Sequence, residues 1–71
     1  MLEKRSFTLS GHRTSVALEP EFWTALAALS AATGRSLSTL IAETDAARPA
    51  GRPLASALRV RALRERPPRA E

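Results

Sequence analysis

The N-terminal part of the chain alternates between hydrophobic and polar positions. Phe7 and Leu9 are separated by one residue, and so are Val16 and Leu18. A period of two is typical of a β-strand. The Ser-Gly pair at residues 10–11 lies between the two alternating runs and favours a turn. We therefore expect β structure at this end of the chain and nowhere else.

The second alternating run predicts a strand at residues 12–18 with two different faces. The face expected to cover the core carries Thr14, Val16 and Leu18. The outward face carries Arg13, Ser15 and Ala17. A lone strand cannot satisfy its own backbone donors and acceptors, so it needs a partner strand from within the chain or from a second copy.

After the second run the hydrophobic spacing changes to three and four residues. Pro20 suits the first turn of a helix, and Phe22, Leu26 and Leu29 then form one apolar helical face. Gly34 is suited to end that helix in a left-handed conformation. We therefore expect a helix between the proline and the glycine.

A second helix is expected after Ser36, a favourable N-cap residue, because Leu37, Leu40 and Ile41 form another amphipathic stripe. Residues 48–53 interrupt the pattern with two prolines and a glycine. A third helical pattern follows, and it carries the arginines Arg59, Arg61, Arg64 and Arg66. We interpret this basic face as solvated rather than as a binding site.

Composition limits what the chain can do. Among 71 residues there is no Cys and a single His, which excludes disulfides and a thiolate- or His-based metal site. There is also no Gly-rich phosphate loop and no cluster of carboxylates, so we expect no catalytic residues, no cofactor and no metal. A monomer of this length is marginal, which makes oligomerisation the expected support.

Charge and hydropathy bear on partners and location. The formal net charge of +4 favours an anionic partner or simply good solubility. No hydrophobic run approaches the roughly 20 residues of a membrane span. The first residues lack the apolar core of a secretory signal. We expect a bacterial-type cytoplasmic protein with no membrane partner.

Residues 12–44 resemble ribbon-helix-helix proteins of the Arc and MetJ type, and most closely a bacterial subgroup of ribbon-helix-helix domains. The resemblance rests on the block RTSVALEPEFW at residues 13–23, followed by Gly34 and Ser36. In that family two chains pair their strands into an antiparallel ribbon, which enters the DNA major groove above four helices. The implied fold class is mostly α with a short β-ribbon, a ribbon-helix-helix dimer with an extra C-terminal basic helix.

The resemblance also implies a division of the chain. Residues 1–48 would form the ribbon-helix-helix domain with an N-terminal arm or strand. Residues 49–71 would form a linker, the short basic helix and a frayed tail. We expect no internal repeat.

By position, the resemblance implies roles for individual residues. The base-reading ribbon residues would be Arg13, Ser15 and Ala17, although the family usually has a longer polar side chain at the last position. The residues holding a phosphate would be Arg35, Ser36 and Leu37, where the start of a helix favours an anion. The arm contacts would be Lys4 and Arg5. The dimer core would comprise Val16, Leu18, Phe22, Trp23, Leu26, Leu40 and Ile41.

Two arrangements remain open for residues 1–10. They form a loose arm that contacts phosphate, or they pair with residues 12–18 across a two-residue turn. The pairs of the second arrangement are Leu9 with His12, Phe7 with Thr14, and Arg5 with Val16. Two such hairpins joined at their second strands would make a sheet about 14 Å wide, wider than the major groove at about 12 Å.

Two functions follow from these expectations. The first is a dimeric DNA-binding transcription regulator that reads the major groove with an intermolecular β-ribbon. The alternative is a small dimeric adaptor of the same fold, which binds an unidentified protein partner without sequence-specific DNA binding. A homodimer predicts an unfolding midpoint that rises with protein concentration.

Overall fold

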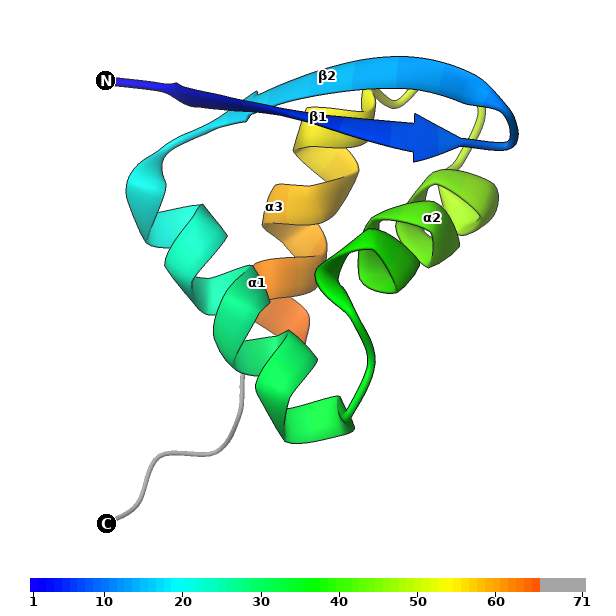
Figure 1. The fold of residues 1–71 in the computed structure, drawn as a ribbon. Helices are drawn as coiled ribbons and strands as arrows, with labels where there is room; N and C mark the ends of the chain where they lie inside the picture. Colours follow the sequence, from blue (N-terminus) through cyan, green and yellow to red (C-terminus); the bar gives the residue numbers. More distant parts are fainter. Residues whose placement is uncertain (66–71) are drawn as a thin grey trace, which may run out of the picture.

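A computed structural model describes residues 1–65 as a two-stranded β-ribbon packed on three helices (Figure 1). The strands are β1, Glu3–Leu9, and β2, His12–Leu18. The helices are α1, Pro20–Thr33, α2, Leu37–Ala47, and α3, Leu54–Arg64. The expected fold class, a short ribbon followed by helices, is confirmed. The expected frayed tail lies outside the described residues.

The N-terminal segment is a strand of the ribbon. β1 pairs antiparallel with β2, and the register places opposite each other Arg5 and Val16, Phe7 and Thr14, and Leu9 and His12. The turn residues Ser10 and Gly11 both have positive φ, at 51° and 80°. Two successive positive φ values are the mark of a type I′ turn, whose twist matches that of the flanking strands. The hairpin arrangement is therefore confirmed, and the loose arm is wrong.

The hairpin answers the question of where β2 finds its partner. Within the described residues the sheet has two strands, and both belong to this chain. The ribbon that the family resemblance assigns to two chains is thus formed here by one.

A single chain also closes the core beneath the ribbon. The buried cluster joins the inner side of both strands to all three helices, and its members are Leu9, Val16, Leu18, Trp23, Leu26, Ile41, Leu58 and Ala62. All seven residues expected in a dimer core pack within this one chain, with Phe22 only partly buried and the other six buried. Their burial does not require a second copy, and the homodimer stays a prediction.

The third helix is part of this core. α3 contacts β2, α1 and α2, and it buries Ala57, Leu58 and Ala62. It begins beneath the ribbon and runs away from it (Figure 1). The core therefore extends across the division that the sequence suggests at residue 48.

Within residues 1–65 no single helix is long and hydrophobic enough to cross a membrane. Helices α1 and α2 reach the necessary length and hydrophobicity only when they are taken together, and the chain bends by 103° between them.

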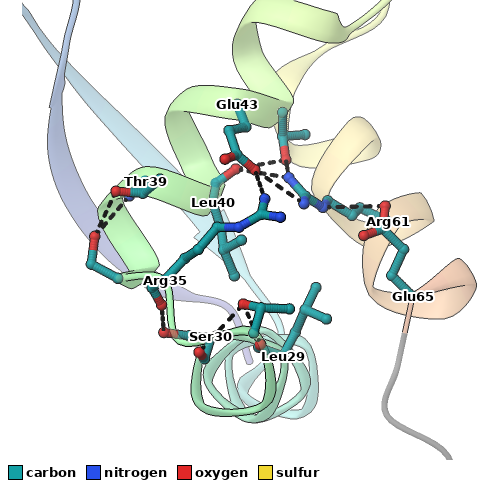
Figure 2. Close-up of polar contacts among 11 residues, drawn as sticks. Leu29, Ser30, Arg35, Thr39, Leu40, Glu43, Arg61 and Glu65 are labelled. Atoms are coloured by element: carbon teal, nitrogen blue, oxygen red, sulfur yellow. Dashed lines mark hydrogen bonds and ion pairs between the residues drawn. The ribbon is translucent and has the colours of Figure 1, made fainter.

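Two arginines on α3 contact residues outside that helix. Arg59 Nε donates to Glu19 Oε1 at 2.9 Å, and its guanidinium lies 5.8 Å from the centre of the Phe22 ring. Arg61 reaches α2, where it donates to the Leu40 carbonyl and to the Thr44 hydroxyl, and pairs with Glu43 (Figure 2). The Arg61 side chain is only 15% exposed. The expectation of a solvated basic face is therefore wrong for Arg61.

Arg61→Ala is expected to lower the free energy of unfolding by about 1–3 kcal/mol. The reason is the removal of charged hydrogen bonds that link α3 to α2. The matched control is Arg64→Ala, because Arg64 is exposed and makes no ion pair among the described residues. That change should stay within about 0.5 kcal/mol. Urea unfolding of both variants measures the difference, and equal losses of stability would contradict the assigned role.

Candidate nucleic-acid interface

The side of the ribbon that faces away from the helices is the candidate interface. Because side chains alternate along each strand, the register brings three cross-strand pairs to this side, Lys4 with Ala17, Ser6 with Ser15, and Thr8 with Arg13. We call these six residues the outer ribbon face. Five of them are exposed, and Ala17 is half-buried. The prediction of an outward face with Arg13, Ser15 and Ala17 therefore matches the register of the hairpin.

The polar groups of the outer ribbon face are only loosely engaged. The hydroxyls of Ser6 and Ser15 lie 3.1 Å apart, and Arg13 Nη1 approaches Thr8 Oγ1 at 3.4 Å, a long contact. Within residues 1–65, neither Lys4 nor Arg13 makes an ion pair. Two cationic groups are thus available on this face for an anionic partner.

The two residues expected as arm contacts lie on opposite sides of the ribbon. Lys4 belongs to the outer ribbon face, whereas Arg5 is opposite Val16 on the inner side. Arg5 pairs with Glu3 at 2.7 Å, and its guanidinium lies 4.8 Å from the centre of the Trp23 ring. A cation above an aromatic face is attracted by the ring quadrupole. Arg5 is therefore engaged within the chain, and Lys4 is the one exposed on the candidate interface.

The start of α2 is a well-formed helix cap. Gly34, with φ of 71°, ends α1 in the left-handed conformation. Ser36 Oγ accepts from the Thr39 N–H at 3.1 Å and donates to Thr39 Oγ1 at 2.8 Å. The sequence expectations for both residues are thus confirmed locally.

The predicted phosphate-binding residues have other contacts here. Arg35 pairs with Glu43 at 2.7 Å (Figure 2). Leu37 is partly buried against the core. Glu43 thereby holds two arginines, since Arg61 contacts the same carboxylate oxygen. The start of α2 lies on the helical side of the molecule, below the ribbon in Figure 1, whereas the outer ribbon face points away from the helices. A phosphate at residues 35–37 stays a prediction.

The comparison with known families identifies this arrangement. The family model described as "Ribbon-helix-helix domain" matches residues 2–65, which include the hairpin and all three helices. The chain belongs to the ribbon-helix-helix family. No curated protein and no solved structure matches it at a significant level.

Family membership makes the outer ribbon face the surface to compare with the DNA-reading ribbon of other family members. Ribbon-helix-helix proteins are generally DNA-binding regulators, and their ribbon is the reading element. The sequence assigned base reading to three residues of β2 alone. In this ribbon-helix-helix chain the hairpin adds Lys4, Ser6 and Thr8 beside them. The signal for this addition was the two-residue turn, which fixes the register once β1 is accepted as a strand.

A concave feature of this ribbon-helix-helix chain lies between α2 and α3, apart from the outer ribbon face. The cavity has a volume of about 370 Å³ and is lined by residues from the end of α2, the linker and α3. Its charges are partly balanced within the chain, because Arg48 pairs with Asp45, and Arg61 with Glu43 and Glu65. We assign this cavity no ligand.

One carboxylate of the described residues has a clearly shifted pKa. Glu19 immediately precedes α1. The pKa of Glu19 is lowered below the ordinary value of 4.5, chiefly by hydrogen bonding of its carboxylate to its own backbone and next by the hydrogen bond from Arg59. Hydrogen bonds to the charged form favour that form. Glu19 therefore contributes stability at neutral pH as the ionised partner of Arg59.

The Glu19 pair is expected to make the fold acid-sensitive. Because the folded-state pKa is depressed, its contribution is present above 4.5 and is lost as the pH falls through the lower folded value. Glu19→Gln should remove this part of the acid-induced fall in melting temperature. Glu21→Gln, in the first turn of α1, is the matched control. Thermal melts from neutral to acidic pH compare the two, and an unchanged acid response in Glu19→Gln would contradict the assignment.

Proposed function

We propose that this protein is a DNA-binding transcription regulator that reads the major groove with the β1–β2 ribbon. The observation that carries the proposal is the outer ribbon face, an exposed polar surface with Lys4 and Arg13 at its ends, on a ribbon-helix-helix chain. Its two strands are separated by a single gap of about 4.8 Å. A ribbon of that width fits a major groove of about 12 Å.

The chemistry of the outer ribbon face suits base edges. Arg13 is able to donate two hydrogen bonds to guanine O6 and N7, Ser15 to bond to any base, and Ala17 to contact a thymine methyl group. The phosphate contacts proposed for Arg35, Ser36 and Leu37 would fix the orientation without carrying base information. This role requires no catalytic residue, cofactor or metal, and it belongs in the cytoplasm.

The hairpin limits how two copies can associate if the ribbon is to enter the major groove. A homodimer that joined two hairpins through the free edges of β2 would present a sheet about 14 Å wide. That sheet exceeds the groove width of about 12 Å. In a groove-reading homodimer each hairpin therefore stays a separate ribbon, and the copies meet through another surface.

The test is fluorescence anisotropy of the full chain with two duplexes, the DNA upstream of its own gene and a scrambled sequence of equal composition, at two salt concentrations. We expect tighter binding to the upstream duplex. Binding to both should weaken steeply with salt, because phosphate contacts release counterions. Equal affinity for both duplexes, or no binding to either, would contradict sequence reading by the ribbon.

The adaptor function is the second candidate, and the free outer edges of the ribbon favour it. Each strand pairs on one side only within the described residues. Unpaired strand edges are templates for a strand from another chain. Absence of DNA binding together with a protein partner retained at moderate salt would support the adaptor over the regulator.

A further inference from the structure

The two strands of the ribbon carry a short sequence repeat. Contrary to the expectation of no internal repeat, residues 3–9 align with residues 12–18 at an offset of nine positions. Five of the seven aligned pairs are identical or similar in character, Lys4 with Arg13, Ser6 with Ser15, Phe7 with Val16, Thr8 with Ala17, and Leu9 with Leu18. The other two, Glu3 with His12 and Arg5 with Thr14, differ. Alternation alone would match apolar with apolar positions, but it would not match a basic residue with a basic residue and a serine with a serine.

The register turns this repeat into approximate two-fold symmetry. Ser6 and Ser15 are directly opposite each other at the centre of the hairpin. A half-turn about an axis through this pair moves Lys4 onto Arg13 and Thr8 onto Ala17. Each strand therefore presents a basic residue, a serine and a small residue in the same order. A ribbon made of two identical chains would present the same symmetric pattern.

The inner side of the hairpin follows the repeat in part. Phe7 and Val16 pack against the helices, and Leu9 and Leu18 are both buried. The inner pair Arg5 and Thr14 departs from the repeat, so on the inner side the symmetry relates residues 7–9 to residues 16–18, while on the outer ribbon face it relates all three positions of each strand. One chain thus supplies both strands, both sets of outward side chains and the core that supports them.

We propose that one chain is a complete reading unit, in which Lys4 and Arg13 contact guanines at the two ends of a short, nearly palindromic DNA site. The proposal rests on the proposed function, since it names how that same ribbon would read DNA. Lysine and arginine both donate to guanine O6 and N7. Ser6 and Ser15 would lie over the centre of the site, where either hydroxyl is able to donate or accept.

The dimensions of the hairpin set the spacing of the site. Four residues separate the Lys4–Ala17 pair from the Thr8–Arg13 pair, a distance of about 14 Å along the ribbon. Successive base pairs rise by about 3.4 Å. The two guanines are therefore expected about four base pairs apart. The approximate two-fold axis places them on opposite DNA strands.

A single-chain reader and a symmetric dimer respond differently to one substitution. In a ribbon made of two β2 strands, Arg13→Ala would remove the contacts at both ends of the site. In the single-chain ribbon, Arg13→Ala removes one end and Lys4→Ala removes the other. Both side chains are exposed and make no ion pair within residues 1–65, so both variants should fold.

The experiment is selection of randomised duplexes by the full-length wild type, Lys4→Ala and Arg13→Ala. Arg64→Ala is the control of equal charge, because it changes the last residue of α3, at the end away from the ribbon (Figure 1). We expect the wild type to enrich a site with a guanine near each end. Each ribbon variant should lose the preference for one guanine by about 5- to 150-fold and keep the other. Arg64→Ala should enrich the wild-type site.

Sedimentation of the selected duplex with wild-type protein completes the test, with one chain per site as the expected result. Loss of both ends in Arg13→Ala and of neither in Lys4→Ala, with two chains per site, would overturn the proposal while leaving DNA reading intact. An unchanged site in Lys4→Ala would overturn it as well. Failure of the wild type to enrich any sequence would instead remove the proposed function itself.

Discussion

Leu58→Asp is expected to unfold the protein. Leu58 lies on α3 with an exposed fraction of 0%, in the cluster that joins the ribbon to α1 and α2. An unpaired carboxylate there costs several kcal/mol. A single core in a chain of this size supplies no more than about 3–5 kcal/mol. The substitution should therefore exceed the whole stability of the fold, and far-UV circular dichroism should show loss of helix at room temperature.

The matched control for this prediction is Leu63→Asp. Leu63 lies on the same helix but is 64% exposed, so its replacement should leave the melting temperature nearly unchanged. A folded Leu58→Asp would mean that α3 does not close the core in solution. A second copy would then have to cover β2, α1 and α2. The unfolding midpoint of the wild type would in that case rise with protein concentration, as the homodimer predicts.

Much of the fold could be predicted because its signals are local. The alternation around Phe7 and Val16, the spacing of three and four in α1, the left-handed Gly34 and the N-cap Ser36 each act over a few residues. Even the hairpin register follows from the two-residue turn. What the sequence leaves open is whether β1 pairs at all, since Arg5 is unsuited to an inner position. The structure resolves this by placing its guanidinium over Trp23, a contact between residues distant in sequence.

The packing of α3 could not be predicted for the same physical reason. Its leucines and alanines indicate an apolar face, but not which surface covers it. The partners of its arginines are remote, with Glu19 lying 40 residues from Arg59 and Glu43 lying 18 residues from Arg61. A charged residue on a helix has the same sequence pattern whether it is solvated or bridged to another element. The pattern alone therefore favours the solvated interpretation, which is wrong for Arg61.

The candidate site was predicted in part. The alternation of β2 places Arg13 and Ser15 outward from sequence alone, because Val16 and Leu18 are its most apolar residues. The sequence left the contribution of β1 open as one of two arrangements, and it did not reveal the repeat. Only two of the seven aligned positions are identical, Ser6 with Ser15 and Leu9 with Leu18. So short a repeat is not recognisable from sequence alone. It becomes evident once the register places Ser6 and Ser15 opposite each other.

Arg13→Ala is expected to preserve the fold and to reduce sequence-specific DNA binding. Arg13 is exposed, and its one polar contact within residues 1–65 is the long one to Thr8, so its removal should leave the melting temperature unchanged. Each guanine contact is worth about 1–3 kcal/mol of base discrimination. The substitution removes one such interaction from a single-chain ribbon, whereas it removes two from a symmetric dimer. The size of the effect therefore reports on the assembly as well as on the residue.

Arg13→Lys is the matched variant for this prediction. It keeps the charge, and thus the attraction to phosphates. Lysine also donates to guanine, but it lacks the rigid planar fork of the guanidinium, so part of the preference should be lost. Anisotropy against the upstream and scrambled duplexes at two salt concentrations should show retained affinity for the scrambled duplex and reduced preference for the upstream one. Arg13→Ala should weaken binding to both duplexes. It should also make the affinity less dependent on salt, because each phosphate that the Arg13 side chain neutralises accounts for about one released counterion. If both variants discriminate between the duplexes as well as the wild type does, Arg13 is not a reading residue. The outer ribbon face would then be better explained as an adaptor surface.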